Sequence, residues 1–125
     1  MTQTFRIEQT LPNLNDYTKA CRGNRYGGAA MKKRCEDIIA GYIRAAGVKP
    51  CAGPVYIKYL WVEQNKRRDL DNISSFGRKV INDSLVNTGI LAGDGPTHIK
   101  GFSDEFAYDR DGPGVVVRVE EEEDA

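Results

Sequence analysis

Hydrophobic residues along the chain fall into short alternating runs and two helical repeats, separated by polar breaks. Segments with the alternation or the branched and aromatic content of strands lie at residues 4–8, 54–63, 98–108 and 115–120. Segments with the period of amphipathic helices lie at residues 29–46 and 73–87, and a helical turn is expected around 14–21. This order predicts an α+β (mixed α/β) fold: one small domain, with about four strands in a sheet and two main helices packed on it.

Each helical segment has defined ends and one apolar face. The first stops at Gly47 and Pro50, and the second begins at Asp71 or Asn72 as N-cap and stops before Gly89. The first is expected to bury Met31, Cys35, Ile38, Ile39 and Tyr42. The second is expected to face the sheet with Ile73, Gly77, Val80, Ile81, Ser84 and Leu85, and to carry Asn72, Phe76, Lys79 and Asp83 on a neighbouring stripe. In strand 54–63, Trp61 and the tyrosines are expected in the core or a dimer interface.

The composition of the 125 residues, 40% hydrophobic and 29% charged, is that of a globular protein. We expect one domain at residues 1–119 and an acidic tail at residues 120–125. There is neither a run long enough to span a membrane nor signal-peptide architecture, and the three cysteines have no paired spacing. The expected location is the cytoplasm. The single histidine, His98, has no spaced partner for zinc, so a structural role is expected.

The zero net charge hides an asymmetry between the two parts of the chain. Residues 1–100 carry 16 Lys/Arg and 9 Asp/Glu, whereas residues 101–125 carry 2 and 9. The first part therefore has the excess of cations that suits a polyanionic partner. The terminal acidic run is either a solvated tail or a segment that competes with nucleic acid for the basic surface.

The segment Lys66-Arg67-Arg68-Asp69-Leu70-Asp71-Asn72 places three cations directly before two carboxylates. In an extended segment, alternate side chains point to the same side, so Asp69 and Asp71 are expected to aim at one point. Two convergent carboxylates suit a divalent metal ion, and the neighbouring cations suit a phosphate backbone. Asn72 is either a metal or phosphate ligand or a helix cap.

Further acids and a lysine follow at spacings that can complete such a site. Lys79 and Asp83 are neighbours on one helix face, and Asp94 lies in a glycine-flanked turn just beyond the helix. A short return through Gly89 to Leu91 would bring Asp94 toward that pair. Three or four acids can hold one or two Mg²⁺ or Mn²⁺ ions, and a lysine at the rim can stabilise the transition state. Asp83 either supports the metal or only pairs with Lys79.

The KRRDLDN segment, with Lys79, Asp83 and Asp94 after it, resembles the RusA-type Holliday-junction resolvases, small endonucleases often carried by phages and prophages. The resemblance covers roughly residues 55–95. It implies that Asp69, Asp71 and Asp94 form the metal-binding catalytic cluster, that Lys79 is required for cleavage, and that Asp83 matches a further acid. Residues 74–78 make the helix about one turn longer than in the type member, which keeps the same face.

The resemblance further implies a homodimer that binds four-way junctions and nicks two opposed strands, in DNA recombination and repair. An aromatic wedge at the junction centre is reasonable, but no residue is assigned to it. The expected DNA-contacting residues are Lys66, Arg67, Arg68, Asn72, Lys58, Arg22, Arg25, Lys32 and Lys33, with Arg34 beside them.

Two other functions compete with a Mg²⁺-dependent endodeoxyribonuclease. One is a binder of branched DNA that has the same fold and no turnover; the carboxylates argue against it, because acids beside DNA do not help a pure phosphate binder. The other is a transferase that holds a nucleotide diphosphate through the Asp69–Asp71 pair. For that class the chain is short, and no pocket for a nucleotide base is evident.

Overall fold

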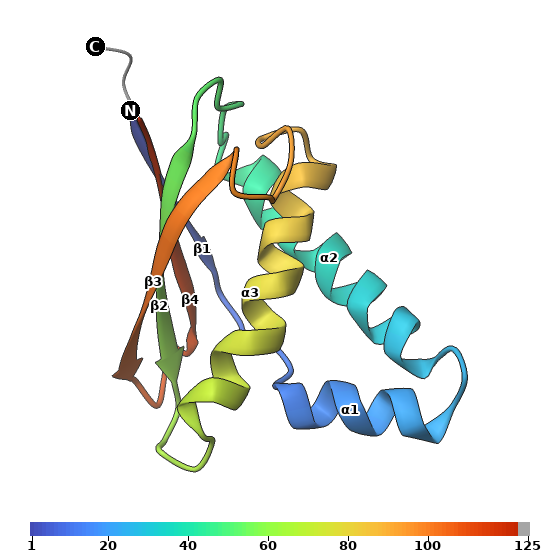
Figure 1. The fold of residues 1–125 in the computed structure, drawn as a ribbon. Helices are drawn as coiled ribbons and strands as arrows, with labels where there is room; N and C mark the ends of the chain where they lie inside the picture. The colour runs from blue at the N-terminus through green and yellow to red at the C-terminus, as the bar shows by residue number, and fades with distance from the viewer. Residues whose placement is uncertain (123–125) are drawn as a thin grey trace.

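The computed structural model describes residues 1–122, which form a two-layer domain of one sheet and three helices (Figure 1). The sheet has four strands in the order β1-β4-β2-β3. The α+β prediction is therefore confirmed, with α1 as a third, shorter helix. In chain order the elements are β1 (Thr2–Ile7), α1 (Leu14–Gly23), α2 (Gly27–Ala45), β2 (Val55–Glu63), α3 (Leu70–Asn87), β3 (Ile99–Tyr108) and β4 (Gly114–Glu121).

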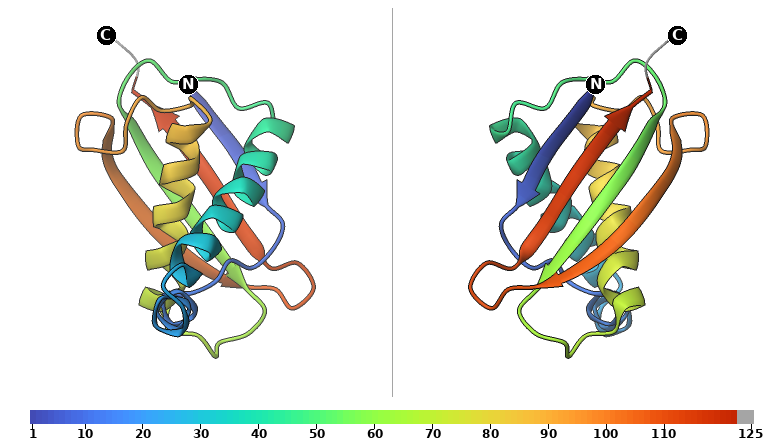
Figure 2. Two further views of the ribbon diagram at one scale, coloured as in Figure 1. Left: turned by 90° about the vertical axis from the view of Figure 1, so that its right-hand side faces the viewer. Right: turned by 90° about the vertical axis from the view of Figure 1, so that its left-hand side faces the viewer.

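The sheet is mixed because one of its connections is a helical crossover. Strands β2 and β3 are parallel and are joined through α3, whereas β4 pairs antiparallel with both β2 and β1. All three helices lie on one face of the sheet, and the opposite face has no helix over it (Figure 2). The crossover places the start of α3 near the end of β2 and the end of α3 near the start of β3.

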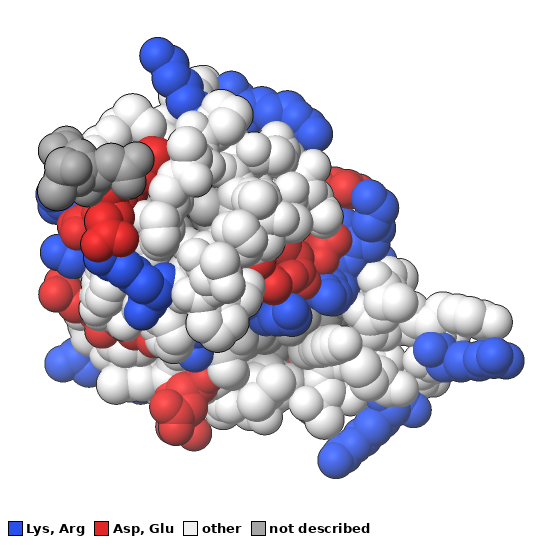
Figure 3. All heavy atoms as spheres, turned by 45° about the horizontal axis from the view of Figure 1, so that its top comes forward, with Lys and Arg blue, Asp and Glu red and all other residues white. Residues whose placement is uncertain are grey.

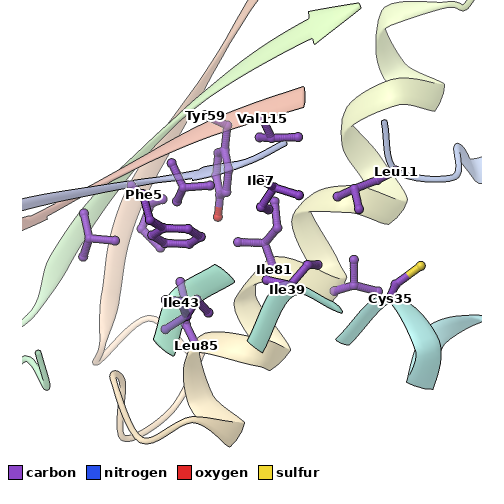
Figure 4. Close-up of a cluster of buried hydrophobic side chains, with 14 of the residues drawn as sticks. Phe5, Ile7, Leu11, Cys35, Ile39, Ile43, Tyr59, Ile81, Leu85 and Val115 are labelled. Atoms are coloured by element: carbon purple, nitrogen blue, oxygen red, sulfur yellow. The ribbon is translucent and has the colours of Figure 1, made fainter. Parts of the chain in front are cut away.

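The core lies between the sheet and the helices (Figure 4). Strand β1 contributes Phe5 and Ile7, α2 contributes Ile39 and Ile43, and α3 contributes a stripe of small and branched residues. That stripe is the one expected from the sequence, and all six of its members are buried: Ile73, Gly77, Val80, Ile81, Ser84 and Leu85. Trp61 and Tyr59 of β2 are also buried, which confirms their expected place in the core.

Helix α3 crosses β2 at very short range, and Gly77 makes this possible. A Cβ atom added to Gly77 would lie 2.7 and 2.8 Å from two ring carbons of Trp61. No side chain fits in that space, so a glycine sits where the helix meets the indole. The position of α3, and with it the position of every polar residue on the helix, depends on this contact.

Three details of the helices differ from the sequence predictions. Helix α3 begins at Leu70 with Asp69 as its N-cap, so the assignment of the cap to Asp71 or Asn72 was wrong. Ile38 is 40% exposed, and Ile43 takes the buried place on α2 because it continues the 35–39 stripe at the next four-residue step. Phe76, on the stripe that also carries Asn72, Lys79 and Asp83, is buried because α1 covers it. The ring centroids of Tyr17 and Phe76 lie 4.7 Å apart.

The acidic tail begins later than expected. Glu120 and Glu121 belong to β4, where the Glu120 carboxylate contacts Lys58 at 3.1 Å and the Glu121 carboxylate accepts a hydrogen bond from the Ala52 amide. Of the rest of the predicted tail, residues 123–125 lie outside the described residues. None of the helices in the described part of the chain combines the length and the apolar character needed to cross a bilayer.

Candidate active site

Lys79, Asp83 and Asp94 meet at the C-terminal half of α3. The ammonium of Lys79 lies 3.3 Å from Asp83 Oδ1 and 3.5 Å from Asp94 Oδ2. Lys79 and Asp83 are one turn apart on the helix, and Asp94 comes from the following loop. These three residues are the second half of the site expected from the sequence, and the structure brings them together.

Asp94 reaches this position because the chain turns back directly after α3. Gly89 adopts a φ of 82°, which a glycine accepts without strain, and it ends the helix. The amides of Ile90 and Leu91 both donate to the carbonyl of Leu85, and both side chains are buried in the core. The return through Gly89 to Leu91 is thus confirmed, and it anchors the turn that carries Asp94.

Helix α2 adds a second cation and a third acid to this cluster. Lys32 Nζ lies 2.9 Å from Asp83 Oδ2 and 3.8 Å from Glu36 Oε1. A depression of about 310 Å³ is lined by Lys32, Glu36, Asp83 and Asp94, with Val86 and Asn87. On the face that comes forward in Figure 3, acidic side chains gather in one place with basic side chains around them. Lys32 was expected to contact DNA, but here it neutralises an acid.

The lysines decide the ionisation of Asp83. Burial disfavours its charge, but hydrogen bonds from Lys32 and Lys79 outweigh burial and hold the pKa of Asp83 below its usual value. The same bond from Lys32 to Asp83 raises the pKa of Lys32 despite partial burial. Asp83 is therefore a carboxylate at neutral pH, and each of its two oxygens has an ammonium beside it.

Asp69 and Asp71 lie at the opposite end of α3. Both are exposed, Asp69 as the N-cap in extended conformation and Asp71 in the first helical turn. Asp71 lies in the helix, so the alternation of an extended segment applies to Asp69 alone, and the convergence of the two carboxylates stays a prediction. Twelve residues separate Asp71 from Asp83, about 18 Å along the helix axis at 1.5 Å per residue.

The acids of one chain thus form two separate groups rather than one. Across residues 1–122, no group of three or more His, Cys, Asp or Glu side chains has the geometry to hold a metal ion. Carboxylate oxygen is the donor that Mg²⁺ and Mn²⁺ prefer, so the residue types fit these ions. At the Asp83 end, two ammonium groups occupy the carboxylate oxygens and compete with a metal for them.

Arg68 is turned toward the protein rather than toward solvent. Its guanidinium lies 3.3 Å from Glu63 Oε1 and donates to the carbonyl of Leu11 at 3.0 Å. Burial raises the pKa of Glu63, and the charge of Arg68 opposes that rise. Arg68 therefore fastens the β2–α3 loop to the chain before α1, which is a structural role, and its contact with DNA stays a prediction.

The neighbouring cations, Lys66 and Arg67, are exposed. The ammonium of Lys66 lies 5.1 Å from the centroid of the Tyr108 ring. The backbone amide of Arg67 donates a hydrogen bond to the side-chain oxygen of Asn65. Asn72 is half-buried in the first turn of α3. Lys66 and Arg67 are exposed in the loop that leads to Asp69, so both remain candidates for phosphate contact.

The other expected DNA contacts are spread over three surfaces. Lys58 lies on the sheet face without helices and pairs with Glu120, while Lys33 pairs with Asp37 at 2.9 Å along α2. Arg22 and Arg25 stand at the connection between α1 and α2, where no acid of the described chain lies within ion-pair distance. Lys58 and Lys33 thus each have an acid beside them, whereas Arg22 and Arg25 have no ion pair among residues 1–122.

One polar cluster beside α3 was not anticipated. Asp104 of β3 accepts a hydrogen bond from Trp61 Nε1 at 2.9 Å and another from Arg78 at 2.6 Å, and the guanidinium of Arg78 lies 4.4 Å from the centroid of Phe102. The signal in the sequence was an acid at alternate spacing between Phe102 and Phe106, on the helix-facing side of a strand. The cluster fixes the middle of α3 to the edge strand β3.

No model of a known protein family matches the chain, and a search of curated proteins also found no match.

Proposed function

We propose that the protein is a metal-dependent, structure-selective DNA endonuclease of the junction-resolving type, similar to the RusA resolvases. The observation that carries this proposal is the meeting of Lys79, Asp83 and Asp94, with the lysine within 3.5 Å of both acids. A phosphodiesterase needs carboxylates for the metal and a cation near the scissile phosphate, and these residues supply both. The resemblance of the KRRDLDN segment adds Asp69 and Asp71 as the remaining acids.

Asp69, Asp71, Asp83 and Asp94 are the residues that would hold Mg²⁺ or Mn²⁺. When bound, the metal supplies an activated water and neutralises charge at phosphorus. Lys79 then has a role of its own: its side chain is 60% exposed, and its ammonium can leave an acid for a substrate phosphate oxygen. Lys32 is less exposed and keeps Asp83 ionised and oriented.

A second copy of the chain would resolve the separation of the acids along α3. Two α3 helices placed antiparallel about a two-fold axis bring the start of one beside the end of the other. Asp69 and Asp71 of one copy would then complete the donor set around Asp83 and Asp94 of the other. Each dimer would contain two equivalent sites, which suits a junction with two opposed strands to nick.

The substrate would be held mainly through its phosphates. Lys66 and Arg67 lie in the loop before Asp69, and Arg22 and Arg25 lie at the α1–α2 connection. Helix α1 packs on the first half of α3 through Tyr17 and Phe76. The β2–α3 loop and the α1–α2 connection both lie in the lower half of Figure 1. Binding through them would weaken steeply as salt is raised.

The second candidate, a binder of branched DNA without turnover, is favoured by one observation. Both oxygens of Asp83 are engaged by ammonium groups, at 2.9 Å from Lys32 and 3.3 Å from Lys79. A carboxylate in this state is a weak metal ligand until a lysine moves. The two candidates differ in what happens after binding, so an activity measurement separates them.

The test is incubation of the purified protein with a synthetic four-way junction and Mg²⁺, beside a linear duplex of the same sequence. We expect paired symmetric nicks in the junction, none without metal, and little cleavage of the duplex. The Asp71→Asn variant should bind the junction and fail to nick it. Tight binding by the wild type without metal-dependent nicks would favour the binder, and equal cleavage of the duplex would remove the junction specificity.

A further inference from the structure

Tyr26, at the connection between α1 and α2, is largely exposed to solvent. Its side chain is 67% exposed, more than any other large hydrophobic residue within residues 1–122, and the guanidinium of Arg25 lies 5.3 Å from its ring centroid. The connection projects away from the sheet at the far end of α1 (Figures 1 and 2). A single exposed aromatic ring is common on protein surfaces, so what sets Tyr26 apart is the arginine beside the ring and the charge around it.

Hydrogen bonds and close backbone contacts fix the conformation of the α1–α2 connection, which carries Tyr26. The Asn24 side chain accepts a hydrogen bond from the Tyr26 amide at 2.9 Å, and its carbonyl accepts one from Gly27 at 3.0 Å. A Cβ at Gly27 would lie 2.3 Å from the Ala20 carbonyl oxygen, and one at Gly28 would lie 2.2 Å from Cys21 Sγ. Only glycine allows α2 to start this close to the end of α1.

The surroundings of Tyr26 are strongly basic. Residues 17–35 contain six Lys or Arg and no Asp or Glu. In the space-filling view, basic side chains project from the protruding part of the molecule and acidic ones do not appear there (Figure 3). Of these six cations, Lys19, Arg22 and Arg25 precede Tyr26 in the chain and have no acid within 4 Å among residues 1–122.

We propose that Tyr26 and Arg25 form a stacking site for unpaired nucleobases, with Lys19 and Arg22 contacting the flanking phosphates. An exposed ring with an arginine on it offers a surface for a base, and cations around it follow the backbone. This inference goes beyond the proposed nuclease function, because it requires neither metal nor cleavage. It names single-stranded or locally unpaired nucleic acid as the partner of this surface.

Phe102 provides a matched control elsewhere in the molecule. It is 48% exposed and has the guanidinium of Arg78 at 4.4 Å from its ring centroid, so the same pair of groups is present. The difference is electrostatic, because Arg78 is ion-paired with Asp104 at 2.6 Å. A neutralised arginine has little attraction left for a phosphate, so this pair should not bind nucleic acid.

The test is equilibrium binding, in EDTA, of a fluorescent oligothymidine and of an abasic oligonucleotide of the same length. The wild type should prefer the thymidine strand by roughly tenfold. Tyr26→Ala should lose that preference and keep its affinity for the abasic strand, whereas Tyr26→Phe and Phe102→Ala should behave as the wild type. Arg25→Ala should weaken binding of both strands and reduce the dependence on salt.

Equal binding of the two strands by the wild type would overturn the proposal, since it would show contact with phosphates alone. An unchanged preference in Tyr26→Ala would overturn it as well, and so would a loss of preference in Phe102→Ala. Because Tyr26 is exposed, Tyr26→Ala should keep the wild-type circular dichroism spectrum and unfolding midpoint. Nicking of junctions is measured separately with Mg²⁺, so a failed nuclease assay and a failed stacking assay are distinct results.

Discussion

The two ends of α3 carry the same kinds of residues in opposite environments. At its start, Asp69 and Asp71 are exposed, and the nearest arginine, Arg68, is committed to Glu63. At its end, Asp83 is drawn into a network with Lys32 and Lys79 that also reaches Asp94. Among residues 1–122, the carboxylates at the start thus have no cation within 4 Å, whereas at the end each oxygen of Asp83 has a lysine beside it.

This difference indicates that neither end is a complete site. In the proposed shared site, the start of α3 supplies carboxylates that no lysine occupies, and the end supplies Asp83, whose oxygens two lysines occupy. The two ends are complementary, because one has the free oxygens and the other has the lysine needed at a phosphate. They lie about 18 Å apart on one helix. The substitutions below separate the two ends, from the largest expected effect to the smallest.

Removing an acid from either end should abolish catalysis by the proposed site. Asp71→Asn at the start and Asp94→Asn at the end should each lower the rate of junction nicking at least about 100-fold, since a lost metal ligand removes several kcal/mol of transition-state stabilisation. The measurement is single-turnover cleavage with saturating protein. Lys100→Ala, at the start of β3 and paired with Glu122, is the control and should nick at the wild-type rate.

If only one of the two acids mattered, the site would belong to a single end of α3. Loss of nicking in Asp94→Asn together with a wild-type rate in Asp71→Asn would show this. The junction affinity of each variant is measured in parallel, so that reduced binding is not taken for reduced chemistry.

The start of α3 should depend on Arg68 for stability rather than for binding. Arg68→Ala leaves the buried Glu63 without its cation and should lower the free energy of unfolding by about 2 kcal/mol at pH 7. Chemical denaturation measures it. Lys66→Ala, an exposed neighbour, is the control and should change stability by less than about 0.5 kcal/mol.

The pH dependence of the Arg68→Ala effect has a definite sign. Burial raises the pKa of Glu63 from its usual 4.5, and Arg68 limits the rise. Without Arg68 the folded protein holds a proton on Glu63 more firmly than the unfolded chain does, so the variant gains stability as the pH falls toward 4.5. The deficit should therefore shrink at acid pH, and a deficit that grows there would contradict this assignment.

The distance between the two ends depends on the seating of α3 against Trp61. Gly77→Ala places a Cβ within 2.8 Å of two indole carbons, and overpacking of this kind costs about 1–3 kcal/mol. The better helix propensity of alanine returns up to about 1 kcal/mol, so we expect a net loss of about 1 kcal/mol. Denaturation of Gly77→Ala beside Gly41→Ala, where the added Cβ meets nothing within 4 Å, checks this. Equal stability of the two variants would mean that α3 is not fixed at Gly77.

The smallest effects should come from the exposed cations at the start of α3. Lys66→Ala and Arg67→Ala should each reduce the slope of log affinity against log salt by about 0.9 for duplex arms, because each removes one phosphate contact. Arg68→Ala should leave the slope unchanged, since its guanidinium is used within the protein. Fluorescence anisotropy at several salt concentrations measures the slopes, and an unchanged slope in the first two variants would place the DNA elsewhere.

The fold and half of the site could be predicted from the sequence because their determinants are local. The alternation of β2, the six-residue stripe of α3 and the turn at Gly89 all depend on near neighbours, and each was confirmed. The errors came from partners distant in the sequence. Helix α3 begins at Leu70 beside a loop that Arg68 ties to Glu63 and Leu11, and Asp83 takes Lys32 from another helix. No spacing along the chain contains that information.

The most direct test of a site shared between two chains is complementation in mixed dimers. Asp71→Asn and Asp94→Asn are each inactive in this proposal, and they are mixed after exchange of subunits is verified with two affinity tags. A mixed dimer has one site with all its acids, so nicking should return to about a quarter of the wild-type rate in an equal mixture. If the acids of each site came from one chain, every site in the mixed dimer would lack an acid. No recovery of nicking would then contradict the shared site.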